Sequence, residues 1–252
     1  MSLSLDQYRA NVQSTLEARM YLLDERERAV REGLRLTDVV LGRIPPMKTK
    51  RPAYMYLSET ERMEAESLMR TDKNIKTLND RTWLNDEVIN TYMELLTSKK
   101  VFCWNTFFWL KLSSNGYSYN SVRKWATKKG VNIGKLDRML VPMNIGKNHW
   151  ALGIVDFKRK TIAYYDSLAP NTVHSGFVEF ITKYIADEVG PIQFSNLLVA
   201  PPQQSNSFDC GVFTCMIAEC LAAGRDWLDF DQSMIPDMRR KIAIQIAHNS
   251  LY

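Results

Sequence analysis

The chain has 252 residues, a net charge of +5, and 45% hydrophobic and 24% charged residues, which is the composition of an ordinary soluble protein large enough for a substantial core. No apolar run approaches the ~20 residues that span a bilayer, so we expect no membrane span. The basic residues are scattered in short clusters typical of solvated turns, and we expect no binding of nucleic acid.

Residues 5–31 are predicted to form one long amphipathic helix, because their apolar side chains recur at steps of three and four. Downstream, the pair Pro45-Pro46 marks a linker. We therefore predict a helical N-terminal arm and linker over residues 1–52, followed by a globular domain over residues 53–252. The apolar stripe of the arm has to pack against something, so the arm is a candidate for binding a further protein.

Helices are predicted in the first half of the globular domain. Residues 58–61, Ser-Glu-Thr-Glu, resemble a capping box and predict a helix over residues 59–69. Asn85 or Asp86 is placed to cap the next helix. A further helix is predicted over residues 118–129.

The hydrophobic period then changes to that of strands, with a hairpin-sized turn at residues 158–160. Helices that flank a central cluster of strands indicate an α+β fold. In chain order, the predicted elements are strands at 138–143, 150–157 and 161–166, a helix from 177 to about 190, a strand at 192–199, and helices at 211–223 and 232–249.

The four cysteines are expected to be free thiols in a reducing compartment. Their spacing fits neither a zinc site nor a compact disulfide framework, the first residues lack the features of a secretion signal, and no metal site is predicted. Cys103, Cys215 and Cys220 are expected in the core. Cys210 stands where a polar loop enters an apolar helix, and a helix N-terminus lowers the pKa of a thiol. Cys210 is therefore the candidate nucleophile.

A nucleophilic thiol requires a base, a group that orients the base, and a donor for the oxyanion. His149 opens an apolar strand and Asp166 ends the next one, so a hairpin places them side by side. Gln204 stands six residues before Cys210, where its amide can reach a developing oxyanion.

Three other polar residues are expected to be structural. His174 lies in a turn rich in Pro, Asn and Ser, and His248 lies near the end of the last helix; both are expected on the surface. Asp209 directly precedes the nucleophile and is a candidate cap for the helix that follows.

Four short segments occur in a distinctive order. They are Trp83-Leu84-Asn85-Asp86, His149-Trp150-Ala151-Leu152, Tyr165-Asp166-Ser167-Leu168, and Gln203-Gln204-x-Asn206-x-x-Asp209-Cys210-Gly211. Together they resemble the ubiquitin-like-protein-specific cysteine proteases that process and remove SUMO, over about residues 55–252. One departure is Ser207, where the family usually has glycine; if that position requires a positive φ, the serine costs about 1 kcal/mol.

The resemblance implies a papain-like cysteine protease fold of the α+β class, with a central mixed sheet flanked by helices. It implies that Cys210 is the nucleophile, that His149 is the general base and acid, and that Asp166 orients His149. Gln204 would line the oxyanion hole, whereas the neighbouring Gln203 would not. This chemistry requires no metal or organic cofactor.

The resemblance also implies the residues that bind the substrate. Trp83 and Trp150 would sandwich the diglycine tail of the modifier, and Asp86 and Phe107 would contact its body. For the two tryptophans, the alternative is ordinary core packing.

The function implied by the resemblance is that of a cysteine-type SUMO endopeptidase and isopeptidase, which matures precursors and deconjugates SUMO-type modifiers from their conjugates. One alternative is a protease for a Nedd-type modifier, with the same catalytic set and a different docking surface. Another is a catalytically dead modifier-binding module, against which the intact His149, Asp166, Gln204 and Cys210 argue. The family resemblance points to the nucleus or nuclear envelope; otherwise a cytoplasmic location is expected.

Overall fold

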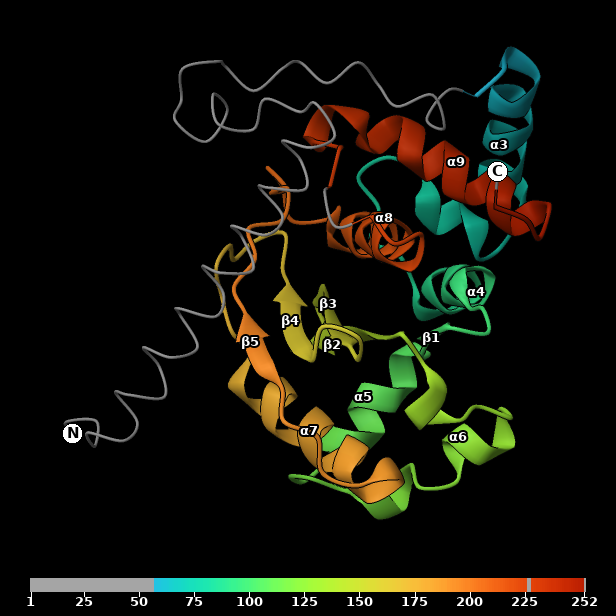
Figure 1. Cartoon of the computed structure of the whole chain (residues 1–252). Helices are drawn as coiled ribbons and strands as arrows, with labels where there is room; N and C mark the ends of the chain where they lie inside the picture. The colour runs from blue at the N-terminus through green and yellow to red at the C-terminus, as the bar shows by residue number, and fades with distance from the viewer. Residues whose placement is uncertain (1–56, 226–227, 252) are drawn as a thin grey trace, which may run out of the picture.

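A five-stranded mixed sheet organises the part of the chain that this computed structural model describes, residues 57–225 and 228–251 (Figure 1). The strands lie in chain order across the sheet: β1 Val101–Cys103, β2 Arg138–Ile145, β3 His149–Asp156, β4 Thr161–Tyr165 and β5 Ser195–Leu197. The three central strands are antiparallel, whereas each edge strand is parallel to its neighbour. The predicted α+β class with a mixed sheet is confirmed.

Two groups of helices cover the two faces of the sheet (Figure 1). On one face lie α3 Glu59–Thr71, α4 Asp86–Leu96, α8 Cys210–Ala222 and α9 Ile235–Ala247. On the other face lie α5 Thr106–Ser113, α6 Trp125–Lys128 and α7 Ser175–Val189. Short 3₁₀ turns are η2 Ile75–Leu78, η3 Tyr119–Ser121, η4 Ile133–Lys135 and η5 Gln232–Met234.

Successive side chains of the central strands point to opposite faces of the sheet and so contribute to both hydrophobic cores. In β3, Leu152 and Ile154 belong to the core beside α4 and α8, whereas Ala151 and Val155 belong to the core beside α5 and α7. Because both faces are covered, the three central strands are apolar at most positions, as in other sheets packed between two helical layers. Gly153 lies between these residues because a Cβ there would meet the Phe177 ring of α7 at 2.1 Å.

The predicted helix starts are confirmed by their caps. Ser58 and Glu61 form a capping box, in which the Glu61 amide donates to Ser58 Oγ at 3.2 Å and the Ser58 amide donates to Glu61 Oε2 at 2.7 Å. Asn85, rather than Asp86, caps α4 by accepting the Val88 amide at 3.0 Å. The Asn85 cap fixes the start of α4 directly after the segment that carries Trp83.

Two predicted elements are shorter than expected. The helix predicted at residues 118–129 is wrong, since only η3 and the single turn α6 form there. The Tyr119 hydroxyl donates to Glu188 of α7 at 3.2 Å, and tertiary contacts of this kind override the helical pattern. The strand predicted at residues 192–199 is reduced to β5, because it is an edge strand that pairs only with the short β4.

The predicted N-terminal arm, residues 1–52, lies outside the described residues. Within the part of the chain that is described, no helix has the length and apolar character needed to cross a bilayer. The longest of the helices given above, α7, has 15 residues, and about 20 are needed for a span.

Candidate active site

Cys210 is the first residue of α8, a helix of 13 residues that runs between the sheet and α9. The thiol is 2% exposed, and it lies at the end of the helix that carries partial positive charge. Gly211 follows because a Cβ at that position would lie 2.8 Å from the Cβ of Leu84. This close approach brings the nucleophile helix against the segment that carries Trp83.

His149 and Asp166 meet at the ends of two paired strands. His149 is the first residue of β3, Asp166 directly follows β4, and His149 Nε2 lies 2.8 Å from Asp166 Oδ1. Cys210 lies close enough to His149 to contribute, with Asp166, to raising the pKa of the imidazole. The structure therefore brings together Cys210, which was predicted from the helix start, and His149 and Asp166, which were predicted from the hairpin.

Asp166 is held by more donors than His149 alone. The Tyr164 hydroxyl donates to Asp166 Oδ2 at 3.0 Å, and the Leu168 amide donates to Oδ1 at 2.8 Å. Burial alone would raise the pKa of the Asp166 carboxyl, but the hydrogen bonds from His149, Leu168 and Tyr164 outweigh it and lower that pKa. Asp166 is therefore an ionised acceptor of fixed orientation.

The hydrogen bond of His149 with Asp166 and the interaction of His149 with Cys210 outweigh the burial of the ring and raise its pKa to about 9. Its ring is therefore favoured as imidazolium at neutral pH. Burial raises the pKa of the Cys103 thiol to about 12 and that of the Cys220 thiol to about 11. These two, with Cys215, are buried core residues, as predicted.

This pKa predicts a pH dependence of stability. A histidine whose pKa rises from 6.5 to about 9 on folding contributes stability that is fully present below pH 6.5 and is lost as the pH rises through 9. The free energy of unfolding of the wild type, relative to that of His149→Gln, should therefore fall between pH 6.5 and 9.5 in urea titrations. A constant difference across this range would contradict the raised pKa.

Gln204 is buried and tied to two neighbours. The Ser167 hydroxyl donates to Gln204 Oε1 at 2.6 Å, and Gln204 Nε2 donates to the Asn206 carbonyl. Because Ser167 holds the carbonyl oxygen of the amide, the NH₂ group is turned toward the loop that leads to Cys210. Gln203 instead donates to the backbone carbonyl of Asp166 at 3.2 Å. The two glutamines thus have different surroundings.

Sequence reasoning missed the supporting residues Tyr164, Ser167 and Asn206. Ser167 and Asn206 lie inside the motifs that identified Asp166 and Gln204, which was the available signal. Tyr164 lies two residues before Asp166, and an alternating strand places such residues on the same side. Their hydrogen bonds orient the candidate catalytic groups.

Two expectations for nearby residues are corrected. Asp209 does not cap α8 through its side chain; its carboxylate instead binds Arg239 at 2.6 Å. His174 is not a free surface residue, because it caps α7 by accepting the Phe177 amide at 3.0 Å on Nδ1, and burial lowers its pKa. Ser207 has no positive φ, so the departure from glycine carries no left-handed strain.

The candidate tail-binding tryptophans lie on adjoining segments. The indole of Trp150 is 7% exposed and donates to the Leu84 carbonyl at 3.1 Å, next to Trp83. Trp83 itself is 48% exposed, which core packing does not explain. Of the two tryptophans, Trp150 is therefore buried and held in place, whereas Trp83 is open to solvent.

Asp86 and Phe107 belong to neighbouring helices on the surface. Asp86 begins α4, and Phe107, 41% exposed, lies in the first turn of α5. The Thr106 amide donates to Asn90 Oδ1 of α4 at 2.8 Å, which holds the two helix starts together. An exposed aromatic side chain such as Phe107 is a feature that protein-docking surfaces share.

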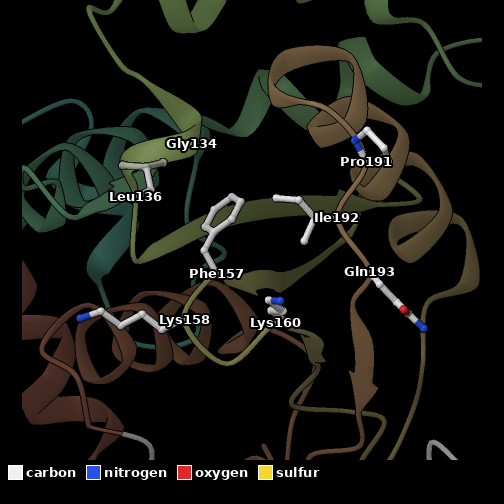
Figure 2. A pocket seen from close by; sticks show the side chains of 8 residues that line it. All are labelled: Gly134, Leu136, Phe157, Lys158, Lys160, Pro191, Ile192 and Gln193. Carbon is white, nitrogen blue, oxygen red and sulfur yellow. The ribbon is translucent and has the colours of Figure 1, made fainter.

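Two hollows lie away from these residues. The one in Figure 2, about 430 Å³, is formed by the β3–β4 turn and the segment after α7, and Lys158 at its edge is paired with Asp137 at 2.7 Å. A larger groove of about 910 Å³ lies between α4, β1 and α6. Neither contains a candidate catalytic residue. Among the described residues, no cluster of His, Cys, Asp and Glu side chains could hold a metal ion.

Comparisons with known proteins show which family the chain resembles. The model of the "Ulp1 protease family, C-terminal catalytic domain" matches residues 82–250. Ubiquitin-like-specific protease 1 of Saccharomyces cerevisiae is 36% identical over 200 residues, which cover 76% of this chain and 32% of that protein. Sentrin-specific protease 2 of Mus musculus is 35% identical over 199 residues, which cover 72% of this chain and 32% of that protein.

The solved structures include the C-terminal Ulp1 protease domain in complex with Smt3, the yeast ortholog of SUMO. It is 32% identical, with a TM-score of 0.71, and the match covers 78% of this chain and 97% of that domain. The chain spans about a third of the length of the curated relatives named above. With a family model that matches most of the described residues, the chain belongs to the Ulp1 protease family.

Proposed function

We propose that this protein is a cysteine protease that cleaves after the diglycine tail of a SUMO-type modifier, both in precursors and in isopeptide conjugates. The observation that carries the proposal is the hydrogen bond of His149 with Asp166, together with the raised pKa of His149, to which Cys210 at the start of a buried helix contributes. The modifier class comes from the relatives, one of which was solved in complex with Smt3.

The geometry supports a two-step acyl transfer. The Cys210 thiolate attacks the terminal glycine carbonyl, and the Gln204 amide with the backbone N–H of Cys210 stabilises the oxyanion. His149 protonates the leaving amine as the C–N bond breaks, which leaves a thioester. His149 then takes a proton from water as it attacks the thioester, and the Cys210 thiolate leaves. Asp166 keeps the imidazole oriented throughout.

Selectivity for the tail follows from the two tryptophans. A diglycine tail has no side chains, so it can lie between the exposed Trp83 ring and the buried Trp150 ring. A larger residue would clash with the indoles, and steric rejection of this kind gives specificity. Asp86 and Phe107, at the starts of α4 and α5, are proposed to contact the modifier body.

The division of the chain and its location are further proposals. Residues 53–252 would form the catalytic domain, and residues 1–52 a separable arm that binds another protein. A nuclear or nuclear-envelope location rests on the family resemblance alone.

An electrophilic probe on the modifier tail tests the function directly. Modifiers of the SUMO, Nedd and ubiquitin types, each ending in a vinyl sulfone, would be mixed with the full chain. We expect a covalent adduct at Cys210 with the SUMO-type probe. An adduct only with the Nedd-type probe would support that alternative, and no adduct with any probe would indicate a catalytically dead module.

Removal of the Gln204 amide tests the oxyanion assignment. Gln204→Ala should lower kcat for tail cleavage by roughly tenfold or more with little change in KM, because an oxyanion donor acts chiefly in the transition state. The matched control is Gln203→Ala, whose side chain binds the Asp166 backbone and should matter much less. A larger effect at Gln203 would show that the roles are reversed.

Deletion of residues 1–52 tests the proposed arm. We expect nearly unchanged turnover of a small tail peptide, because α3 begins at Glu59 with its own capping box and the candidate catalytic residues lie beyond residue 148. Peptide kinetics and thermal unfolding of the two proteins provide the comparison. Loss of both stability and turnover would show that the arm is part of the catalytic domain.

A further inference from the structure

Arg239 of α9 is a buried cation with no part in the mechanism above. It is 1% exposed, and its guanidinium pairs with the Asp209 carboxylate at 2.6 Å. The free-energy cost of removing two charges from water offsets much of the attraction between them, so stabilisation of the fold alone does not explain a buried ion pair. The other hydrogen bonds of the Arg239 guanidinium suggest a different role.

The guanidinium joins two loops that are far apart in sequence. On one side, Nη1 donates to the Asn79 carbonyl at 3.1 Å, and Nη2 donates to the Thr82 carbonyl at 3.0 Å. On the other side, Nη2 donates to the Phe208 carbonyl at 3.3 Å as well as to Asp209. The first loop leads directly into Trp83, and the second leads directly into the nucleophile.

Asp209 extends the connection to the oxyanion loop. Its Oδ2 accepts the side-chain amides of Asn206 at 2.7 Å and Gln232 at 2.8 Å. Asn206 in turn accepts the Asp209 amide on Oδ1 at 3.1 Å, and its carbonyl accepts Nε2 of Gln204. The buried Arg239 guanidinium therefore holds, through Asp209 and Asn206, both the start of the nucleophile helix and the Gln204 side chain expected to bind the oxyanion.

The same two loops also touch beyond the guanidinium. Leu84 packs against Gly211 with no room for a Cβ, and its carbonyl accepts the Trp150 indole. Contact through Leu84 sets how near the Trp83 segment can come to α8, and Arg239 keeps the segment from moving away. The position of the backbone that carries Trp83, relative to Trp150 and Cys210, is thus fixed from both sides.

We propose that Arg239 is a positioning residue that sets the width of the tail slot relative to Cys210, and so determines how strictly glycine is required at the penultimate position of the tail, two residues before the cleaved bond. This inference rests on the proposed function, because it concerns the slot for the diglycine tail. A lysine would keep the positive charge beside Asp209. It lacks the planar set of five donors that lets arginine bind both loops at once.

The test compares Arg239→Lys with the wild type on two substrates, a SUMO-type precursor with its Gly-Gly tail and the same precursor with an Ala-Gly tail. A slot of fixed width should discriminate the added methyl group by about 10- to 200-fold in kcat/KM. Arg239→Lys should lower kcat/KM for the Gly-Gly substrate and reduce this discrimination roughly tenfold. The control is Arg240→Lys, the neighbouring arginine of α9, which binds the exposed Glu66 at 3.2 Å and should leave the discrimination unchanged.

The readout separates positioning from mere stability. If Arg239→Lys loses overall rate but keeps the wild-type discrimination, the proposal is overturned. If that variant does not fold, Asp209→Asn replaces it, because the asparagine retains the shape and an acceptor oxygen while weakening the hold on Arg239; it should shift the discrimination in the same direction. Failure of the wild type to cleave the Gly-Gly precursor would instead overturn the proposed function, and with it this inference.

Discussion

Replacement of Cys210 by serine is expected to reduce isopeptide cleavage below about one hundredth of the wild-type rate while modifier binding is retained. A hydroxyl at this position lacks the accessible anion and the intrinsic nucleophilicity of the thiol. The rest of the site, including the His149–Asp166 contact, does not depend on the sulfur atom. Single-turnover cleavage of a SUMO-type conjugate and titration of the mature modifier against the mutant would measure the two effects separately.

Two other cysteines serve as controls for this change. Cys215 and Cys220 lie further along the same helix, are fully buried and have raised pKa values because of burial. Serine at either position is expected to reduce stability, because it buries a hydroxyl in an apolar core. The remaining folded protein should cleave at close to the wild-type rate. Cleavage by Cys210→Ser at more than about one hundredth of the wild-type rate would place the nucleophile elsewhere.

The sequence predicted those parts of the molecule in which local pattern and tertiary structure agree. The strands β2 to β4 are apolar on both faces, so their period could be predicted, and the short turn at residues 158–160 allowed the pairing of β3 with β4 to be predicted. The contact of His149 with Asp166 follows from the same hairpin. Cys210 at the start of α8 could be predicted because the chain changes there from polar to continuously apolar.

The remaining features depend on contacts between distant segments, which no local pattern encodes. Residues 118–129 have a helical period but are held by α7 through Glu188 and so form only separate turns. Asp209 precedes a helix and has the chemistry of a cap, yet a guanidinium thirty residues away takes its carboxylate. Arg239 itself, in a run of charged residues, had every sequence feature of an exposed side chain.

Replacement of His149 by alanine is expected to lower kcat by about 10²- to 10⁴-fold with little change in KM, since one imidazole serves as both general acid and general base. Alkylation of Cys210 by iodoacetamide at pH 7 should also slow, because the imidazolium that stabilises the thiolate is removed. This second readout requires no modifier, so it tests the contact between the two side chains independently of the proposed substrate.

Asp166→Ala should be less severe than His149→Ala, because the aspartate orients and stabilises the imidazolium but transfers no proton itself. His248→Ala is the matched histidine control, since that ring binds Glu64 on the surface at 3.0 Å. An ordering in which His149→Ala is the most impaired, Asp166→Ala is intermediate and His248→Ala is near wild type would agree with the geometry. Full activity of Asp166→Ala would mean that the 2.8 Å contact with His149 has no part in catalysis, and that other groups orient the imidazole.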